Sequence, residues 1–273
     1  MLYNAQIQFL EPIGENTMTK IEWVQNQDGT KGQTWNPTTG CTKISPGCKH
    51  CYAETMAKRL KMMGVKGYEK GFELVLHEQR LGQPLKRKKA TTYFVNSMSD
   101  LFHENVPDYF IEQVFEVIEK TPQHTYQIVT KRSERMAYFC QTHQMPDNAW
   151  LGVSVEDKKY GLPRIEHLRT IDARIRFLSI EPLLENLGIM DLSGIHWVIV
   201  GGESGPKARP MKIEWVTKIK NQCQQVNIPI FIKQMGSHWA HHHRAKNGKG
   251  NDMAEWDKKL RVRDYPFMLA LSV

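Results

Sequence analysis

The chain has 273 residues, 40% of them hydrophobic, a formal net charge of +8 and a sequence pI of about 9.1. This length allows one large barrel or two ordinary domains, and no apolar run approaches the roughly 20 residues of a membrane span. The opening also lacks the basic and apolar regions of a secretory signal. These features argue against a membrane partner and against secretion, so we expect a cytoplasmic protein with reduced thiols. The positive charge favours an anionic partner such as nucleic acid or a phosphorylated metabolite.

The first residues read as an extension that precedes the folded part. Met18 opens the stretch MTKIEWV, which looks like a natural start, so residues 1–18 are predicted to be an N-terminal extension. Residues 21–24 alternate apolar and polar side chains, and this alternation predicts a short first strand.

Residues 35–54 form a loop that holds three of the five cysteines, Cys41, Cys48 and Cys51, within eleven residues. Prolines and glycines in this stretch favour tight turns, which suit a loop that wraps around a small group. Thiolates are the preferred ligands of iron–sulfur clusters and zinc, and three of them leave one of four positions open. Zinc completed by a distant histidine, and free or disulfide-bonded cysteines, are the alternatives. The other two cysteines are isolated and expected to be structural.

The cysteine spacing resembles that of radical S-adenosylmethionine enzymes, which carry CxxxCxΦC with an aromatic residue at Φ. The last turn here reads C-K-H-C and places His50 at the aromatic position, whereas six residues instead of three separate Cys41 from Cys48. The resemblance implies a 4Fe–4S cluster whose open iron binds S-adenosylmethionine, with His50 beside the adenine. The alternative is that His50 is itself the fourth metal ligand.

Beyond the cysteines, strands alternate with helices. A helix follows Cys51 and ends at Gly64, and residues 65–90 are polar and irregular, with a basic run at 86–89. Nearly all-apolar strands are predicted at 92–96, 125–130, 150–155, 175–180, 196–200 and 230–233, with helices at 107–119, from 133, before 169 and at 213–226. This pattern predicts a parallel sheet covered by helices. We predict an α/β fold with a single TIM-like (β/α) barrel, complete or partial, over residues 19–236. A Rossmann-like sheet is the runner-up, because GGESG follows a strand.

Polar or charged side chains follow each apolar strand. Because the active site of a (β/α) barrel lies at the carboxyl ends of its strands, we expect a polar bowl beneath the cysteine loop. Carboxylates suit the amino group of S-adenosylmethionine, hydroxyls its ribose, lysines a carboxylate or phosphate, and glycines a close backbone approach. The candidate catalytic residues are Lys131, Glu156, Glu181 and Lys233, and the candidate cofactor-binding residues are His50, Ser154, Ser179, Gly201, Gly202, Glu203 and Ser204. The alternative is that strands simply end in polar residues.

Residues 237–273 form a basic C-terminal tail that contains a cluster of histidines. We expect this tail to be flexible, with metal binding by the histidines as the alternative; its last residues, FMLALSV, either pack on the barrel or are loose. The cluster consists of His238, His241, His242 and His243.

Seven motifs together resemble one family, the phage Gp-37/Gp-68 proteins, which carry a domain of unknown function (DUF family 5131). The motifs are TWNPTTGCTKISPGCKHCYAE, FVNSMSDLFHE, VTKRSERM, NAWLGVSVE, RFLSIEPLL, HWVIVGGESGPKARPM and FIKQMG. The resemblance implies a radical-SAM-like barrel, the three cysteines as cluster ligands and a phage or mobile-element origin, but no known reaction. In radical enzymes a GGE motif follows an early strand, whereas Gly201 to Glu203 follow a late one, so its role does not transfer by position.

Two classes of function follow. In the first, the protein is a radical S-adenosylmethionine enzyme that receives electrons from a donor and modifies or repairs nucleic acid or a nucleotide-type substrate in the host cytosol. In the second, a cluster or zinc staples the loop of a non-catalytic phage protein, and the positive surface binds DNA or a protein partner.

Overall fold

The computed structural model describes residues 19–266, so the predicted extension at 1–18 and the final residues 267–273 lie outside the described part. A seven-stranded parallel sheet forms its centre, in the order β1-β4-β5-β6-β7-β8-β9. The strands are short and largely apolar, as is usual where both faces of a sheet are covered. Their bounds are β1 Gln33–Trp35, β4 Thr92–Val95, β5 Thr125–Thr130, β6 Ala149–Ser154, β7 Ile175–Ile180, β8 Trp197–Gly201 and β9 Ile230–Gln234; β2 Thr38–Thr39 and β3 Val75–Leu76 form a separate antiparallel pair.

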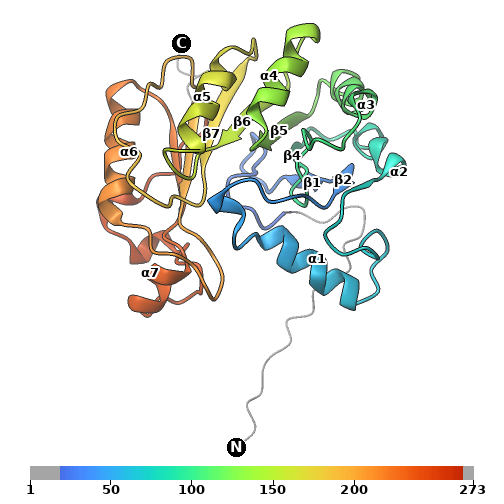
Figure 1. Ribbon diagram of the computed structural model, residues 1–273. Coiled ribbons are helices and arrows are strands. Elements are labelled where there is room, and N and C mark those ends of the chain that lie inside the picture. Colours follow the sequence, from blue (N-terminus) through green and yellow to red (C-terminus); the bar gives the residue numbers. More distant parts are fainter. Residues whose placement is uncertain (1–18, 267–273) are drawn as a thin grey trace, which may run out of the picture.

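Helices α3 to α6 lie along the outer face of this sheet, which curls into a half-barrel, and α1 and α7 lie below it in the view of Figure 1. The helix bounds are α1 Tyr52–Met62, α2 Glu78–Leu81, α3 Asp108–Glu119, α4 Ser133–Thr142, α5 Gly161–Arg169, α6 Ile213–Gln225 and α7 Ser237–His242. The strands follow chain order without the reversal of a doubly wound sheet. The predicted partial barrel is therefore confirmed and the Rossmann-like alternative is wrong. Residues 65–90, expected to be irregular, contain β3 and α2. Among residues 19–266, no helix is long and apolar enough to cross a membrane.

Side chains of the sheet alternate between the outer core and the barrel interior. On β7, Leu178 packs in the outer core under the helices, whereas Phe177 belongs to an inner aromatic cluster. Gly152 on the neighbouring strand makes room for that ring, since a Cβ there would lie 2.7 Å from Phe177 Cζ. The same alternation turns Ser154 and Ser179, which pair in register, toward the interior. The interior is thus apolar near the start of the strands and polar at their carboxyl ends, hereafter called the mouth.

Residues 19–31 close the apolar end of the half-barrel. Trp23 is 2% exposed, and its ring centroid lies 4.8 Å from that of Phe94 and 6.1 Å from that of Trp197. The strand predicted at 21–24 is wrong, because this segment forms a turn followed by an isolated bridge from Gln25 to Lys31. Its apolar residues alternate because they plug the barrel, not because they pair in a sheet.

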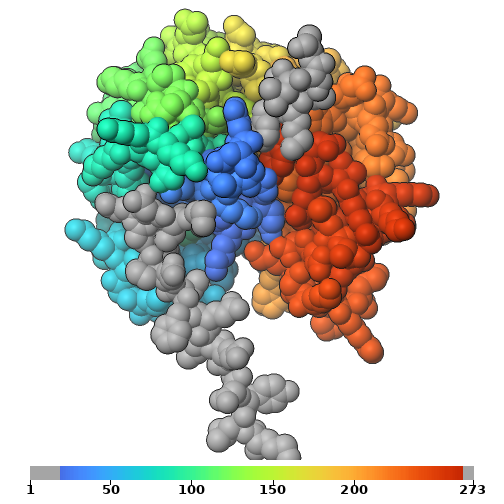
Figure 2. All heavy atoms as spheres, turned by 180° about the vertical axis from the view of Figure 1, so that it is seen from behind, coloured from blue at the N-terminus to red at the C-terminus, as the bar shows by residue number. Residues whose placement is uncertain are grey.

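Residues 237–266 pack against the barrel instead of forming the flexible tail that we expected. Trp256 joins the outer core, and the Arg263 guanidinium lies over the Phe231 ring at 5.2 Å while its backbone bridges to β9. Tyr265 donates a hydrogen bond to the carbonyl oxygen of Glu22 at 3.3 Å. The two ends of the described chain therefore lie side by side, as the adjoining blue and red surfaces in Figure 2 show.

Candidate functional site

The cysteine loop, residues 40–51, is attached to the mouth from its first residue. Gly40 has a φ of +84°, and a Cβ there would lie 1.9 Å from the carbonyl oxygen of Glu73, so the position requires glycine. Its N–H donates to the Met98 carbonyl at 3.0 Å, and its carbonyl accepts from the Ser99 hydroxyl at 2.6 Å. Because both partners follow β4 closely, the loop starts at the carboxyl end of that strand.

Arg132 fixes the first cysteine of the loop to the ends of β4 and β5. Its guanidinium donates to Cys41 Sγ at 3.5 Å and to the Asp100 carboxylate at 3.2 Å. It also donates to the Thr42 hydroxyl and to Glu104, each at 2.7 Å. Burial raises the pKa of the Cys41 thiol to about 11, with Asp100 adding to the rise and Arg132 opposing it. A raised pKa favours the protonated thiol. Binding to a metal centre would favour the thiolate instead, because coordinated thiols are deprotonated.

Glu156 ties the middle of the loop to the end of β6. The Ser45 hydroxyl donates to Glu156 and lies 3.7 Å from Cys48 Sγ. Glu156 is fully buried, and its second oxygen accepts from Arg164 Nη1 at 2.7 Å. Burial pushes the pKa of Glu156 upward, but the charges of Lys131 and Arg164 outweigh burial and the net shift is downward. The carboxylate is therefore ionised, and both its oxygens are already engaged.

Glu181 and Lys233 form an ion pair at the ends of β7 and β9. Their nitrogen and oxygen atoms lie 3.2 Å apart. Gly201 leaves room for this carboxylate, since a Cβ there would lie 2.6 Å from Glu181 Oε1. Tyr52, the first residue of α1, is 53% exposed, and its hydroxyl donates to the carbonyl oxygen of Ser97, just after β4.

Glu203, just after β8, binds Arg209 by two side-chain hydrogen bonds of 2.9 and 2.5 Å. Desolvation raises the pKa of Glu203, but these bonds outweigh it and the net shift is downward, with His50 contributing to the lowering. The space beside Gly202 is filled by protein, since a Cβ would lie 2.3 Å from the Met235 carbonyl oxygen. Ser204 is partly exposed. A cofactor role for these residues stays a prediction.

The structure places the three predicted carboxylates at the carboxyl ends of β6, β7 and β8, and one of them, Glu156, contacts the loop residue Ser45. Contacts of the loop reach the carboxyl ends of three successive strands, β4 to β6, through Gly40, Cys41 and Ser45. This arrangement suits a site in which the loop holds one reactant and the mouth holds another.

The three loop cysteines are all free and partly exposed. Lys43, which lies between Cys41 and Cys48 in the loop, pairs with Glu54 at 2.7 Å, and this hydrogen bond is the largest cause of its raised pKa. Within residues 19–266, no group of three or more His, Cys, Asp or Glu side chains is placed to hold a single metal ion, and this includes the histidines of α7. The set is therefore not preformed for zinc, whose thiolates would sit about 3.8 Å apart in a tetrahedron of 2.3 Å bonds.

The remaining two cysteines lie elsewhere. Cys140 Sγ is 3.4 Å from Met145 Sδ, and Cys223 is buried in α6. Burial raises the pKa of each thiol to about 12. Both are structural in this fold, and the loop has no fourth thiol.

Sequence reasoning missed several residues of the site. Ser45 and Tyr52 flank the cysteines, but nothing in the sequence indicates that they reach the strand ends. The role of Arg164 could have been predicted from the sequence. It lies four residues before Leu168, and this helical spacing places both on the buried side of α5. A charge on the apolar face of a helix predicts a buried partner, which here is Glu156.

Comparisons with known proteins give one family and several distant folds. The family described as "Protein of unknown function (DUF5131)" matches residues 18–262. No curated protein matches the sequence. Spore photoproduct lyase complexed with dinucleoside spore photoproduct aligns with a TM-score of 0.41 and 13% identity, over 69% of this chain and 59% of that chain. A radical SAM methyltransferase from Sphaerobacter thermophilus aligns with a TM-score of 0.44 and 12% identity, over 83% and 74%. This chain thus spans 59% of the length of the first of these proteins, and likenesses of this size do not carry an activity over.

Proposed function

This chain belongs to the DUF5131 family. We propose its activity from the site itself: a radical S-adenosylmethionine-type iron–sulfur enzyme. One observation carries the proposal. A loop with three free cysteines contacts the carboxyl ends of three successive strands of a partial barrel, where barrels of this kind bind their reactants. The cluster ligands would be Cys41, Cys48 and Cys51.

The donor set fits a 4Fe–4S cluster with one iron left for a cofactor. Three thiols in one loop supply three ligands, and soft thiolates are what such clusters require. When bound, the cluster and S-adenosylmethionine would supply reductive cleavage of the cofactor and hydrogen abstraction from a substrate. Arg132 orients Cys41 and donates to its sulfur, in the way that outer groups tune metal ligands.

Residues of the mouth would bind and orient the cofactor. Lys233 and Glu181 offer a cation for a carboxylate and an anion for an amino group, side by side. Ser154 and Ser179 pair in register on neighbouring strands, and their buried hydroxyls would donate to or accept from the ribose of the cofactor. Glu203 would have to share its carboxylate with Arg209, so we assign the amino group to Glu181 in preference.

The proposed substrate is nucleic acid or a nucleotide-type molecule, which the enzyme would modify or repair. A net charge of +8 complements the phosphates of such a substrate. The proposal includes a phage or mobile-element origin, action in the host cytosol and an electron donor that reduces the cluster.

Anaerobic reconstitution of cysteine variants tests the cluster. We expect about four irons per chain in the wild type, and loss of iron in Cys41→Ala, Cys48→Ala and Cys51→Ala. Two matched controls, Cys140→Ala and Cys223→Ala, keep their iron because neither thiol belongs to the loop. Stoichiometric zinc without iron would refute the proposal and favour the non-catalytic, metal-stapled protein that binds DNA or another protein.

His50→Phe separates two roles for this histidine. If His50 lies beside the cofactor, the variant keeps its cluster spectrum and most S-adenosylmethionine binding, because a flat ring is retained. If His50 ligates the metal, the variant loses iron or changes its absorption spectrum, and the open iron on which the proposal depends does not exist.

A further inference from the structure

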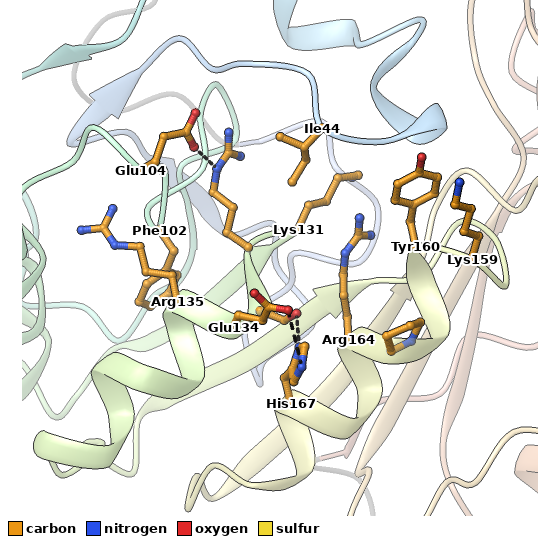
Figure 3. A pocket seen from close by; sticks show the side chains of 13 residues that line it. Ile44, Phe102, Glu104, Lys131, Glu134, Arg135, Lys159, Tyr160, Arg164 and His167 are labelled. Carbon is orange, nitrogen blue, oxygen red and sulfur yellow. Dashed lines mark hydrogen bonds and ion pairs between the residues drawn. The ribbon is translucent and has the colours of Figure 1, made fainter.

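A cavity of about 400 Å³ lies outside the cysteine loop, between α4 and α5. Ile44 of the loop and Phe102, which follows β4, form its apolar wall. Figure 3 shows Lys131 and Arg164 extending along it and Tyr160 at its edge. Arg132 lines the cavity as well and also contacts Cys41, so the cavity and the candidate cluster site share a wall.

The cations of this cavity fall into two groups. Three arginines are each paired with a carboxylate, namely Arg132 with Asp100, Arg135 with Asp108 and Arg164 with Glu156. Two lysines, Lys131 and Lys159, form no ion pair with any residue from 19 to 266. Lys131 is partly buried, and Lys159 is exposed with its ammonium 5.1 Å from the centroid of the Tyr160 ring.

The two acidic residues that line the cavity do not neutralise the positive charge of Lys131 and Lys159. Glu104 accepts from Arg132 at 2.7 Å and is already bound. Glu134 lies at the rim, with its side chain 86% exposed and one carboxylate oxygen 3.9 Å from the Nε2 atom of His167. Exposed acids at such distances act weakly through water. The charge of Lys131 also lowers the pKa of the buried Glu156, but that carboxylate is paired with Arg164 at 2.7 Å. The two lysines are therefore the cations of the cavity that have no ion pair of their own within the described residues.

The first turn of α4 adds hydrogen-bond donors to the same wall. Ser133, Glu134 and Arg135 line the cavity, and the residue before them, Arg132, provides no side-chain cap for this turn. The opening N–H groups of a helix lack partners within the helix and favour negative charge. Beside them, Tyr160 offers an aromatic face of the kind on which nucleobases stack.

We propose that this cavity binds a phosphate ester, with Lys131 and Lys159 as its pairing cations and Tyr160 beside the attached nucleoside. The ester belongs either to a nucleic-acid backbone or to a mononucleotide. This substrate class rests on the proposed function, whereas phosphate binding itself requires no cluster, because the two lysines do not contact the cysteines. The cavity would hold the substrate backbone next to the cysteine loop and thereby position the reacting group at the mouth.

Binding of a fluorescein-labelled single-stranded deoxyoligonucleotide of about ten nucleotides tests this proposal on the cluster-free protein. Anisotropy is measured against salt concentration for the wild type, Lys159→Gln, Lys131→Gln and a matched control, Lys88→Gln. Lys88 is an exposed lysine in the basic run 86–89, which precedes β4 at the opposite end of the barrel. Each cavity variant should weaken binding several-fold and lower the salt slope by roughly 1, whereas the control should match the wild type.

Competition identifies the source of the phosphate. Displacement of the probe by dAMP indicates a mononucleotide site, and displacement by unlabelled oligonucleotide alone indicates a nucleic-acid backbone; either result supports a phosphate-ester site if the cavity variants weaken it. Lys159 is exposed, so its variant should fold even if Lys131→Gln does not. The proposal is overturned if the wild type binds neither ligand, or if Lys159→Gln binds as tightly as Lys88→Gln. Since the cluster is absent throughout, these outcomes are independent of the iron measurements.

Discussion

Replacement of Glu156 by Gln should destabilise the fold strongly, because Glu156 connects the cysteine loop to α5 from a fully buried position. Glu156 and Arg164 lie 2.7 Å apart with side chains 0% and 6% exposed. Removing one charge of such a pair leaves the other buried and uncompensated, which costs about 3–5 kcal/mol. That loss is a large share of the total stability of an ordinary domain.

Urea unfolding of the cluster-free protein, followed by circular dichroism, measures this effect. Glu156→Gln and Arg164→Met should each lower the free energy of unfolding by about 3 kcal/mol or more. The double variant should lose clearly less than the sum, with an interaction of about 2 kcal/mol, because neither member of the Glu156–Arg164 pair is left buried without the other. A single-variant loss below about 1 kcal/mol, or simple additivity, would refute the buried-pair reasoning.

Three further predictions concern the same framework. Arg132→Gln should release iron from the reconstituted protein faster than Arg132→Lys, because the lysine keeps a positive charge beside Asp100 and Cys41. Chelator challenge measures the release rates, and equal rates would contradict a role of this charge in holding Cys41. Desolvation, then the charge of Arg80, lowers the pKa of His77 to about 4, so the free energy of unfolding should fall by about 3 kcal/mol as pH drops from 6.5 to 4; the same pH profile in His77→Gln would exclude His77 as the cause. Gly152→Ala should cost about 1–3 kcal/mol in urea unfolding, because its methyl group would overlap the Phe177 ring; an unchanged midpoint would show that the ring moves aside.

The sheet was predictable because each of its later strands is short and largely apolar. Residues 125–130 and 175–180 were predicted as strands and are β5 and β7 with the same bounds. The plug at Trp23 was not predictable, since an alternating pattern looks the same whether its apolar residues pair in a sheet or fill a barrel end. The packing of Trp256 and Tyr265 was missed for a related reason: isolated aromatics in a polar segment carry no period.

The positions of the candidate site residues at the strand ends were predictable from the sequence, but the residues with which they pair were not. Strand ends gave Glu156, Glu181 and Glu203, because parallel strands place their carboxyl ends together. The arginine partners of Glu156 and Glu203 come from α5 and from the loop before α6, and their approach depends on how those segments turn back over the sheet. Glu181 pairs instead with Lys233 of β9. The space beside Gly201 holds the Glu181 carboxylate, which no local pattern indicates.

Cleavage of S-adenosylmethionine by the reconstituted protein tests the central claim most directly. The protein is incubated anaerobically with dithionite and the cofactor, and 5′-deoxyadenosine is quantified by chromatography. We predict its formation by the wild type and by Cys140→Ala, and its absence in Cys48→Ala, since only the last removes a thiol of the loop. A wild type that holds its full complement of iron yet forms no 5′-deoxyadenosine with dithionite would contradict the account.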